Sequence, residues 1–389
     1  MNEENKKTNK SLAAFILGVV LTLITIFAIA KIGNFVVVHG DENGVIKTIA
    51  KEYSNLPKIL DTIDKKSIFE FNEKNAKDAA LKAVVDSIGD EYSEYLTKKE
   101  TDEWESYLNG EFSGIGISFQ KNDKGEYQVT EVFKDSPAEK SGIKIGDIIL
   151  KVDGNLYKTS EEMSEHIRGE SGTTVELILM RDNKEIKASI TRETVKEKTV
   201  YAKVMDDGSG YIVIKSFEDG TAKEFETELS AFEKQGIKSM VIDLRDNGGG
   251  YIDEGMEIAD RLLKEGTITY MEDVKGKRKY FNSDEKATKI KYVVLVNENT
   301  ASTSEILTAA IKDNNGGKIV GSKTFGKGIV QETTKFKDGS SLKLTVLRYF
   351  SPKGKVIHKK GIKPDVEVKF DPSSGTDNQL EMAKSLLKQ

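Results

Sequence analysis

The sequence predicts a multidomain α/β protein, and three patterns lead to that prediction. From about residue 200 onward, apolar β-branched runs alternate with helical patterns, which indicates a parallel sheet covered by helices. Between residues 110 and 193, short strands are separated by glycine turns, which is typical of a small β domain. An uncharged apolar run at residues 12–30 precedes a region of helical periodicity that ends near residue 107.

The length of 389 residues suits two or three domains. We place the boundaries as follows: a cytoplasmic tail and transmembrane anchor at 1–33, a helical region at 34–107, a β domain at 108–195, an α/β core at 196–372 and a C-terminal helix at 373–389. The C-terminal helix is amphipathic, so both packing on its own chain and pairing in a homodimer fit its pattern.

Composition excludes several kinds of chemistry. The chain has no cysteine, so disulfides and thiol nucleophiles are ruled out. Its three histidines, His39, His166 and His358, lack the spacing of a zinc site, and no metal or other cofactor is expected. The net charge is −5 and no long basic run occurs, which argues against nucleic acid as a partner.

The apolar run from Leu12 to Ala30 has nineteen residues and no charge. At about 1.5 Å per residue, a helix of this length spans a bilayer core of about 30 Å. Lysines precede the run, which favours a cytoplasmic N-terminus. We therefore expect a single-pass anchor in the cell membrane, with the later domains outside the cytoplasm. The alternative is a signal peptide cleaved after Ala28-Ile29-Ala30, which would yield a secreted protein.

The β domain contains three motifs in a characteristic order. They are Gly114-Ile115-Gly116-Ile117, Ser136-Pro137-Ala138, and Gly146-Asp147-Ile148-Ile149. Adjacent glycines let consecutive N–H groups face one anion, and the following strand offers an edge to a peptide. This region resembles a PDZ domain. The resemblance implies that Gly114, Ile115, Gly116 and Ile117 bind the C-terminal carboxylate of a protein or peptide.

Arg168 lies just beyond the last helical stretch of the β domain. Its guanidinium is suited to pairing with a carboxylate or to a gating contact with the neighbouring domain. An arginine that is merely solvated at the surface is the alternative.

Two segments of the α/β core carry groups suited to acyl chemistry. Asp243–Gly250 follows a buried-looking strand and ends in three glycines, which free N–H groups to face a developing oxyanion, although a plain tight turn is the alternative. Asn299–Glu305 lies between a strand and a helix, where N–H groups favour negative charge. Ser304 fits a helix N-cap, which leaves Thr300 and Ser302 in need of another role.

A third segment, Thr324–Gln331, places one lysine between two glycines. Apolar neighbours suggest that Lys327 is partly buried, and desolvation lowers the pKa of a lysine. A neutral lysine can activate a serine without any histidine. A surface lysine in a turn is the alternative.

Together these segments resemble the carboxy-terminal processing peptidases, also called tail-specific proteases. The resemblance begins near residue 85, with GDEYSEYL around Asp90, and continues through SPKGKVIHKKGIKPDVEV near the C-terminus. It implies a PDZ domain beside a crotonase-like α/β protease core. It also implies that Ser302 is the nucleophile, that Lys327, 25 positions later, is the base, and that Gln331 orients the lysine.

The resemblance implies an oxyanion hole made by the N–H of Thr303 with that of Gly248 or Gly249. Thr300 departs from the family, which often has serine at that position. The expected function is a serine endopeptidase that recognises protein C-termini through its PDZ domain. A non-catalytic PDZ adaptor and an acyl-CoA enzyme of the crotonase type are the alternatives, and the apolar N-terminal run argues against the second.

Overall fold

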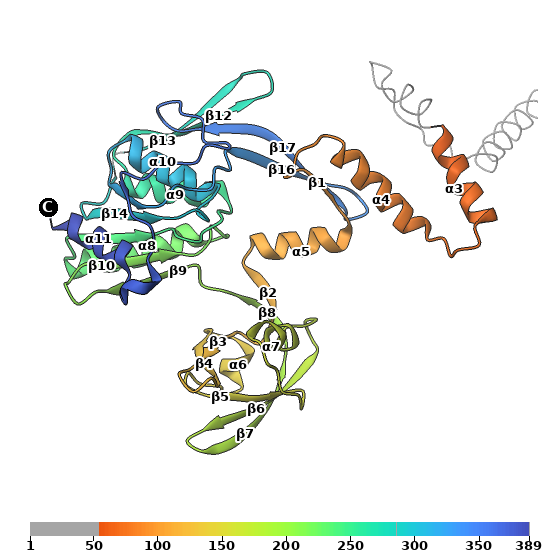
Figure 1. The fold of residues 1–389 in the computed structure, drawn as a ribbon, viewed down its shortest axis with the longest axis horizontal. Coiled ribbons are helices and arrows are strands. Elements are labelled where there is room, and N and C mark those ends of the chain that lie inside the picture. The colour runs from red at the N-terminus through yellow and green to blue at the C-terminus, as the bar shows by residue number, and fades with distance from the viewer. Residues whose placement is uncertain (1–53, 285, 389) are drawn as a thin grey trace, which may run out of the picture. The chain divides into compact units, whose positions relative to one another are not determined.

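The computed structural model describes residues 54–284 and 286–388 (Figure 1). The chain divides into two units, residues 1–77 and 78–389. In the first unit, α3 (Asn55–Lys66) has no buried residue. α4 (Glu73–Asp86) crosses the boundary between the units.

The prediction of a transmembrane helix was wrong for the described fold. Within residues 54–284 and 286–388, no helix combines the length and the apolar character needed to cross a membrane. The longest helix of this part of the chain, α8 (Thr221–Gln235), has 15 residues and several charges, whereas a bilayer requires about 20 apolar residues. The apolar run at residues 12–30, on which the prediction was based, lies outside the described residues. For residues 54–284 and 286–388, the fold class is therefore corrected to a multidomain α/β fold without a membrane-spanning helix.

A short strand interrupts the region that was predicted to be helical throughout. β1 (Glu94–Leu96) separates α4 from α5 (Lys98–Leu108). β1 is a strand because it pairs antiparallel with β17 (Ser341–Phe350), nearly 250 positions away, and no local pattern reveals that partner.

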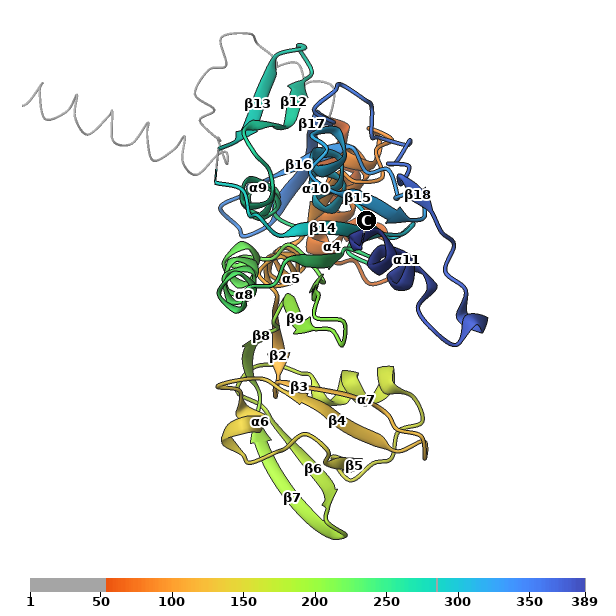
Figure 2. The ribbon, with the colours of Figure 1, turned by 90° about the vertical axis from the view of Figure 1, so that its left-hand side faces the viewer.

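The β domain is an antiparallel sheet in the order β3-β4-β5-β6-β7 (Figure 2). Its elements are β3 (Ile117–Lys121), β4 (Tyr127–Val132), α6 (Pro137–Lys140), β5 (Ile148–Val152), α7 (Ser160–Ile167), β6 (Thr174–Arg181) and β7 (Lys184–Thr191). A two-stranded ladder of β2 (Glu111–Gly114) and β8 (Glu193–Lys196) flanks the domain in sequence. The carboxylate of Asp147 accepts two hydrogen bonds from Arg181, at 2.6 and 2.7 Å, and so ties β6 to the turn before β5.

The α/β core is built on a sheet in the order β18-β15-β14-β11-β10-β9, which is parallel except for β9. Its strands are β9 (Val200–Val204), β10 (Gly210–Ile214), β11 (Ser239–Asp243), β14 (Lys291–Val296), β15 (Lys318–Gly321) and β18 (Val366–Glu367). Alternate residues of β11 face opposite sides. Met240 and Ile242 join the main core with α8, α9 (Ile252–Leu262) and α10 (Thr303–Asp313).

A second, antiparallel sheet covers the same core. It contains β1, β12 (Gly266–Asp273), β13 (Arg278–Ser283), β16 (Ile329–Lys335) and β17. Ile268, Met271 and Tyr349 of this sheet are buried in the main core. β17 therefore holds β16, the strand that follows Lys327, against the body of the protein.

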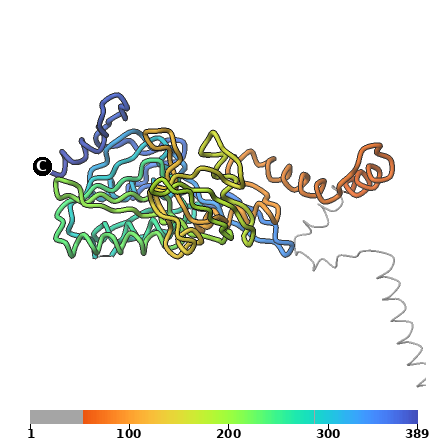
Figure 3. The backbone as a smooth tube through the Cα atoms, turned by 90° about the horizontal axis from the view of Figure 1, so that it is seen from below, coloured from red at the N-terminus to blue at the C-terminus, as the bar shows by residue number. Residues whose placement is uncertain are grey.

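The C-terminal helix α11 (Asn378–Leu387), which follows the 3-10 turn η1 (Pro372–Ser374), packs on its own chain (Figure 3). Ala383 is fully buried with Val241 and Leu295 on the face of the parallel sheet opposite to the main core. Arg245 reinforces this contact, since it donates to Asp243 and to Asp377, the N-cap of α11. The amphipathic pattern is thus satisfied within one chain, and the homodimer stays a prediction.

Candidate active site

Ser302 occupies a sharp turn between β14 and the N-terminus of α10. Its backbone has φ 57° and ψ −120°, a region that residues with a side chain rarely adopt. A serine on such a strand-to-helix turn is held at the exposed tip of the turn, as in the nucleophile elbow of other hydrolases.

Ser304 is not the N-cap that the sequence suggested, because Ser302 holds that position. The Ser304 hydroxyl is buried and donates to the carbonyl of Asn247 at 3.0 Å.

Glu305 joins the serine segment to the lysine segment. Its side chain is fully buried. Oε2 accepts from the backbone N–H of Ser302 at 3.1 Å and of Lys327 at 2.8 Å. Oε1 accepts from the N–H of Gly326 at 2.8 Å and the hydroxyl of Thr324 at 2.5 Å. Burial raises the pKa of Glu305, and these four donors oppose that rise.

Tyr349 makes a second connection between the two segments. Its hydroxyl contacts the carbonyl oxygen of Ser302 at 3.0 Å and that of Lys327. The side chain is almost completely buried, which raises its pKa well above the usual value and keeps it a neutral donor. Ser302 and Lys327 are therefore fixed relative to each other through two buried side chains.

The structure distinguishes between the two glycines considered for the oxyanion hole. The N–H of Gly249 is already bound to the side-chain oxygen of Asn247 at 2.9 Å. Within the described residues, the N–H groups of Gly248 and Thr303 make no internal hydrogen bond. A Cβ on Gly249 would lie 2.7 Å from the Cβ of Ser302, so this turn lies directly against the serine. Gly248 and Thr303 are thus the free donors beside Ser302.

Lys327 is half-buried between Gly326 and Gly328. Burial lowers its pKa, and the positive charge of Lys343 lowers it further. Asp90 and Glu94 act in the opposite direction with smaller effects. The environment therefore favours the neutral amine more than water does.

Gln331 lies on β16 and lines the same pocket as Lys327. Its side-chain amide donates to the hydroxyl of Thr345 on β17 at 3.2 Å. A bulge between Val330 and Gln331 changes the register at this point. Gln331 is thus held by the neighbouring strand, and its proposed action on Lys327 remains a prediction.

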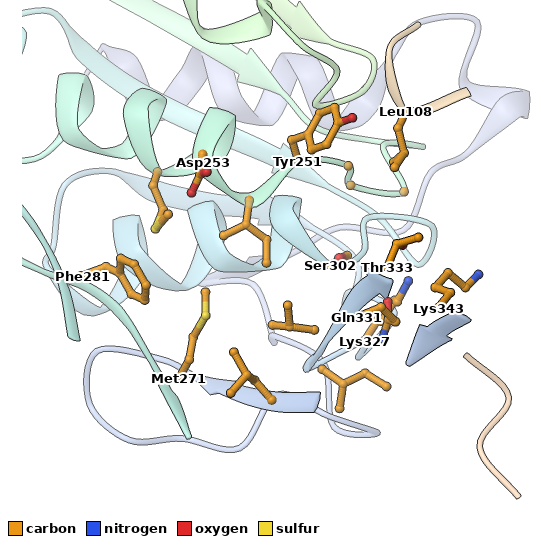
Figure 4. A pocket seen from close by; sticks show the side chains of 18 of the residues that line it. Leu108, Tyr251, Asp253, Met271, Phe281, Ser302, Lys327, Gln331, Thr333 and Lys343 are labelled. Carbon is orange, nitrogen blue, oxygen red and sulfur yellow. The ribbon is translucent and has the colours of Figure 1, made fainter. Parts of the chain in front are cut away.

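Ser302, Lys327 and Gln331 line one pocket of about 930 Å³, together with Gly248 and Gly249 (Figure 4). Figure 4 shows Ser302 at the N-terminal end of α10, with Lys327 and Gln331 to one side. The apolar side chains of Met271 and Phe281 lie on the other side in Figure 4. Ile252, Met256 and Leu347 also line the pocket. The pocket is large enough for several residues of an extended peptide. In the part of the chain that the structure describes, no group of histidine, aspartate and glutamate is arranged to hold a metal.

A second groove, of about 360 Å³, lies in the β domain and is lined by Gly114, Ile115, Gly116 and Ile117. The side chain of Ile115 is fully buried in the domain core, so only its backbone can meet a ligand. Among the described residues, the N–H groups of Ile115 and Gly116 make no internal hydrogen bond. Arg168 also lines the groove, and its guanidinium carbon lies 5.0 Å from the ring centre of Phe112.

This fold and this site define a serine peptidase with an additional peptide-binding domain, and comparison with known proteins agrees. Residues 113–191 match the PDZ domain model and residues 208–368 match the model of peptidase family S41. A "Probable CtpA-like serine protease" of Staphylococcus haemolyticus is 37% identical over 359 residues, covering 91% of this chain and 71% of the relative. A protein of the same name from Staphylococcus aureus is 35% identical, with 94% and 76% covered. The chain belongs to peptidase family S41.

Solved structures support the same family. The photosystem II D1 C-terminal processing protease is 28% identical, with a TM-score of 0.50, over 83% of this chain and 88% of that one. A putative S41 protease from Bacteroides fragilis shares the fold, with a TM-score of 0.56 at 17% identity over 83% and 92% of the two chains. The resemblance to carboxy-terminal processing peptidases and the assignment as a serine peptidase are thereby confirmed, and the adaptor and acyl-CoA alternatives are set aside.

Sequence reasoning missed three residues that organise the site. Glu305 was considered only beside Ser304 as part of a cap, Asn247 stood in the Asp243–Gly250 segment without a role of its own, and Tyr349 was given no role. A glutamate directly inside a mostly apolar helix was a usable signal, because a buried carboxylate requires several donors. For Tyr349 no local signal existed, since its partners are backbone carbonyls far away in the sequence.

Proposed function

We propose that the protein is an endopeptidase in which Ser302 is the nucleophile and Lys327 the general base. The observation that carries this proposal is the buried carboxylate of Glu305, which binds the backbone N–H groups of both residues. A carboxylate used in this way fixes the two segments at one pocket, which both side chains line.

The proposed reaction begins with neutral Lys327, which takes the hydroxyl proton of Ser302 as its oxygen attacks the scissile carbonyl. The N–H groups of Gly248 and Thr303 stabilise the oxyanion, and Thr303, as the first residue of α10, adds the favourable end of the helix dipole. The lysine then returns its proton to the leaving amine, and water hydrolyses the acyl-enzyme by the same route in reverse. Gln331 limits the movement of Lys327.

Substrate selection is proposed to occur in the groove of the PDZ domain. The unpaired N–H groups of Ile115 and Gly116 suit a C-terminal carboxylate, and Arg168 adds a positive charge at the same groove. Proteins or peptides with exposed C-termini are therefore the proposed substrates, with Arg168 as a gating contact. An uncharged apolar run near the N-terminus is a feature of exported chains, so we place the activity outside the cytoplasm.

The test is hydrolysis of dye-labelled casein by the wild type, Ser302→Ala and Ser304→Ala. Ser302→Ala is expected to lose cleavage while keeping the wild-type unfolding temperature. Ser304→Ala is the matched control and should remain active, because Asn247 keeps its bond from the N–H of Ala301. Continued cleavage by Ser302→Ala would overturn the assignment.

A further inference from the structure

The segment Asp90–Leu96 lies beside Lys327, although it precedes the PDZ domain in sequence and the proposed mechanism gives it no role. Nζ of Lys327 lies 4.9 Å from the centre of the Tyr92 ring. This distance is within the range of a cation–π contact, in which the face of the ring attracts an ammonium. Tyr92 is half-buried, so its ring covers the amine without being part of the core.

The segment is bound firmly to the strand that supports the active site. The hydroxyl of Ser93 donates to Asp90 at 2.6 Å and accepts from the backbone N–H of Thr345 at 3.1 Å. The N–H of Tyr92 donates to the same carboxylate at 3.3 Å. β1 then continues the contact by pairing with β17. Tyr92 therefore lies in a turn that is fixed by the buried Ser93 and by β1, which follows it.

Thr345 connects this support to the site from the other side. Its backbone holds Ser93, while its hydroxyl accepts from the amide of Gln331. One residue of β17 thus positions the segment that carries Tyr92 and the glutamine that lines the pocket of Lys327. The ring comes from the turn before β1 and the glutamine from β16, and both of these strands pair with β17.

We propose that Tyr92 is a positioning residue for Lys327, whose ring shields the amine from water and faces the charge that develops on it. This inference rests on the proposed role of Lys327 as the base. Before reaction, the apolar ring helps to keep the amine neutral. Once Nζ has taken the serine proton, the same ring face attracts the ammonium, so the contact is stronger in the transition state than in the ground state.

Removal of the ring changes two opposing effects on the lysine. Loss of the cation–π contact lowers its pKa by less than about one unit. Loss of shielding from water raises the pKa, since complete burial can lower the pKa of a lysine by several units. Desolvation is the largest cause at Lys327, so the pKa should rise. The other charges that face Nζ are Lys343, Asp90 and Glu94, and the substitution leaves all of them in place.

The experiment compares Tyr92→Phe with Tyr92→Ala, measuring kcat/KM on dye-labelled casein against pH. A neutral base makes the rate rise with pH through the pKa of Lys327. Tyr92→Phe keeps the ring, so its kcat/KM should stay within about twofold of wild type and should rise with pH over the same range. Tyr92→Ala should have a kcat/KM about tenfold lower, and the rising part of its pH profile should lie about one pH unit higher. A purely structural role would lower kcat/KM without shifting the pH profile.

Two results would overturn the inference. One is a pH profile of Tyr92→Ala that rises over the same range as that of wild type, and the other is a kcat/KM of Tyr92→Phe as low as that of Tyr92→Ala. Should Tyr92→Ala unfold at the assay temperature, Tyr92→Leu replaces it. The kcat/KM of Tyr92→Leu should be several-fold below that of Tyr92→Phe. Equal values for these two variants would overturn the role of the aromatic ring, because an apolar side chain of similar size would then be sufficient. A failure of the Ser302–Lys327 assignment would look different, because Ser302→Ala would then still cleave casein.

Discussion

At the scale of single residues, the site depends on buried groups that do not line its pocket. Glu305 illustrates this, because one carboxylate accepts from three backbone N–H groups and one hydroxyl. A carboxylate can satisfy all of these donors, since both of its oxygens only accept. The chain thereby holds Ser302 in a strained backbone conformation that a helix N-terminus alone would not impose.

Glu305→Gln tests this role. The amide must turn its NH2 toward at least one backbone N–H, which leaves a buried donor without an acceptor. We expect a loss of about 1–3 kcal/mol in the free energy of unfolding and a clear fall in kcat. Glu298→Gln is the control, because Glu298 is exposed and its carboxylate accepts from the hydroxyl of Ser322 in an exposed hydrogen bond. Equal stability and activity of the two variants would contradict the account.

At the scale of elements, two turns at the carboxyl ends of parallel strands build the site. The turn after β11 supplies Gly248 and Gly249, and the turn after β14 supplies Ser302. β11 and β14 are parallel neighbours, so the two turns leave the sheet at the same edge. Asn247 fastens them together, because its carbonyl accepts from the N–H of Ala301 at 3.0 Å.

The two glycines of the first turn should respond differently to substitution. Gly249→Ala places a Cβ 2.7 Å from the Cβ of Ser302 at a φ of 102°, so the serine must move and kcat should fall by at least about tenfold. Gly248→Ala meets nothing within 4 Å and keeps its N–H, so activity should stay near wild type. Casein hydrolysis and unfolding temperature of both variants check this, and a reversed order of activities would contradict the close approach of Gly249 to Ser302.

The same elements show what the sequence could predict. The strand–turn–helix order and the glycine turns could be predicted because each leaves a local pattern, and the family motifs identified Ser302 and Lys327 as candidates. The strand β1 and the role of Tyr349 could not be predicted, because their partners are distant in sequence. Ser304 was misassigned as a cap because any serine before a helix fits that role, and only the backbone angles of Ser302 show where α10 begins.

At the scale of the whole molecule, the chain combines a peptide groove in its PDZ domain with a peptidase pocket in its α/β core. Segments from far apart in sequence complete the pocket, including α5 before the PDZ domain and β16 and β17 near the C-terminus. The α/β core therefore depends on the chain on both sides of the PDZ domain. The amphipathic C-terminal helix belongs to the same body, since it covers the outer face of the parallel sheet.

The most direct test of the central claim is covalent labelling of the intact protein with a fluorophosphonate, followed by mass spectrometry of the whole chain and of its peptides. The account predicts one adduct per chain, located on Ser302, with Ser302→Ala unlabelled. It also predicts that Lys327→Ala is labelled at least about 100-fold more slowly, since the general base is lost. An adduct on another serine, or a Lys327→Ala variant labelled at the wild-type rate, would contradict it.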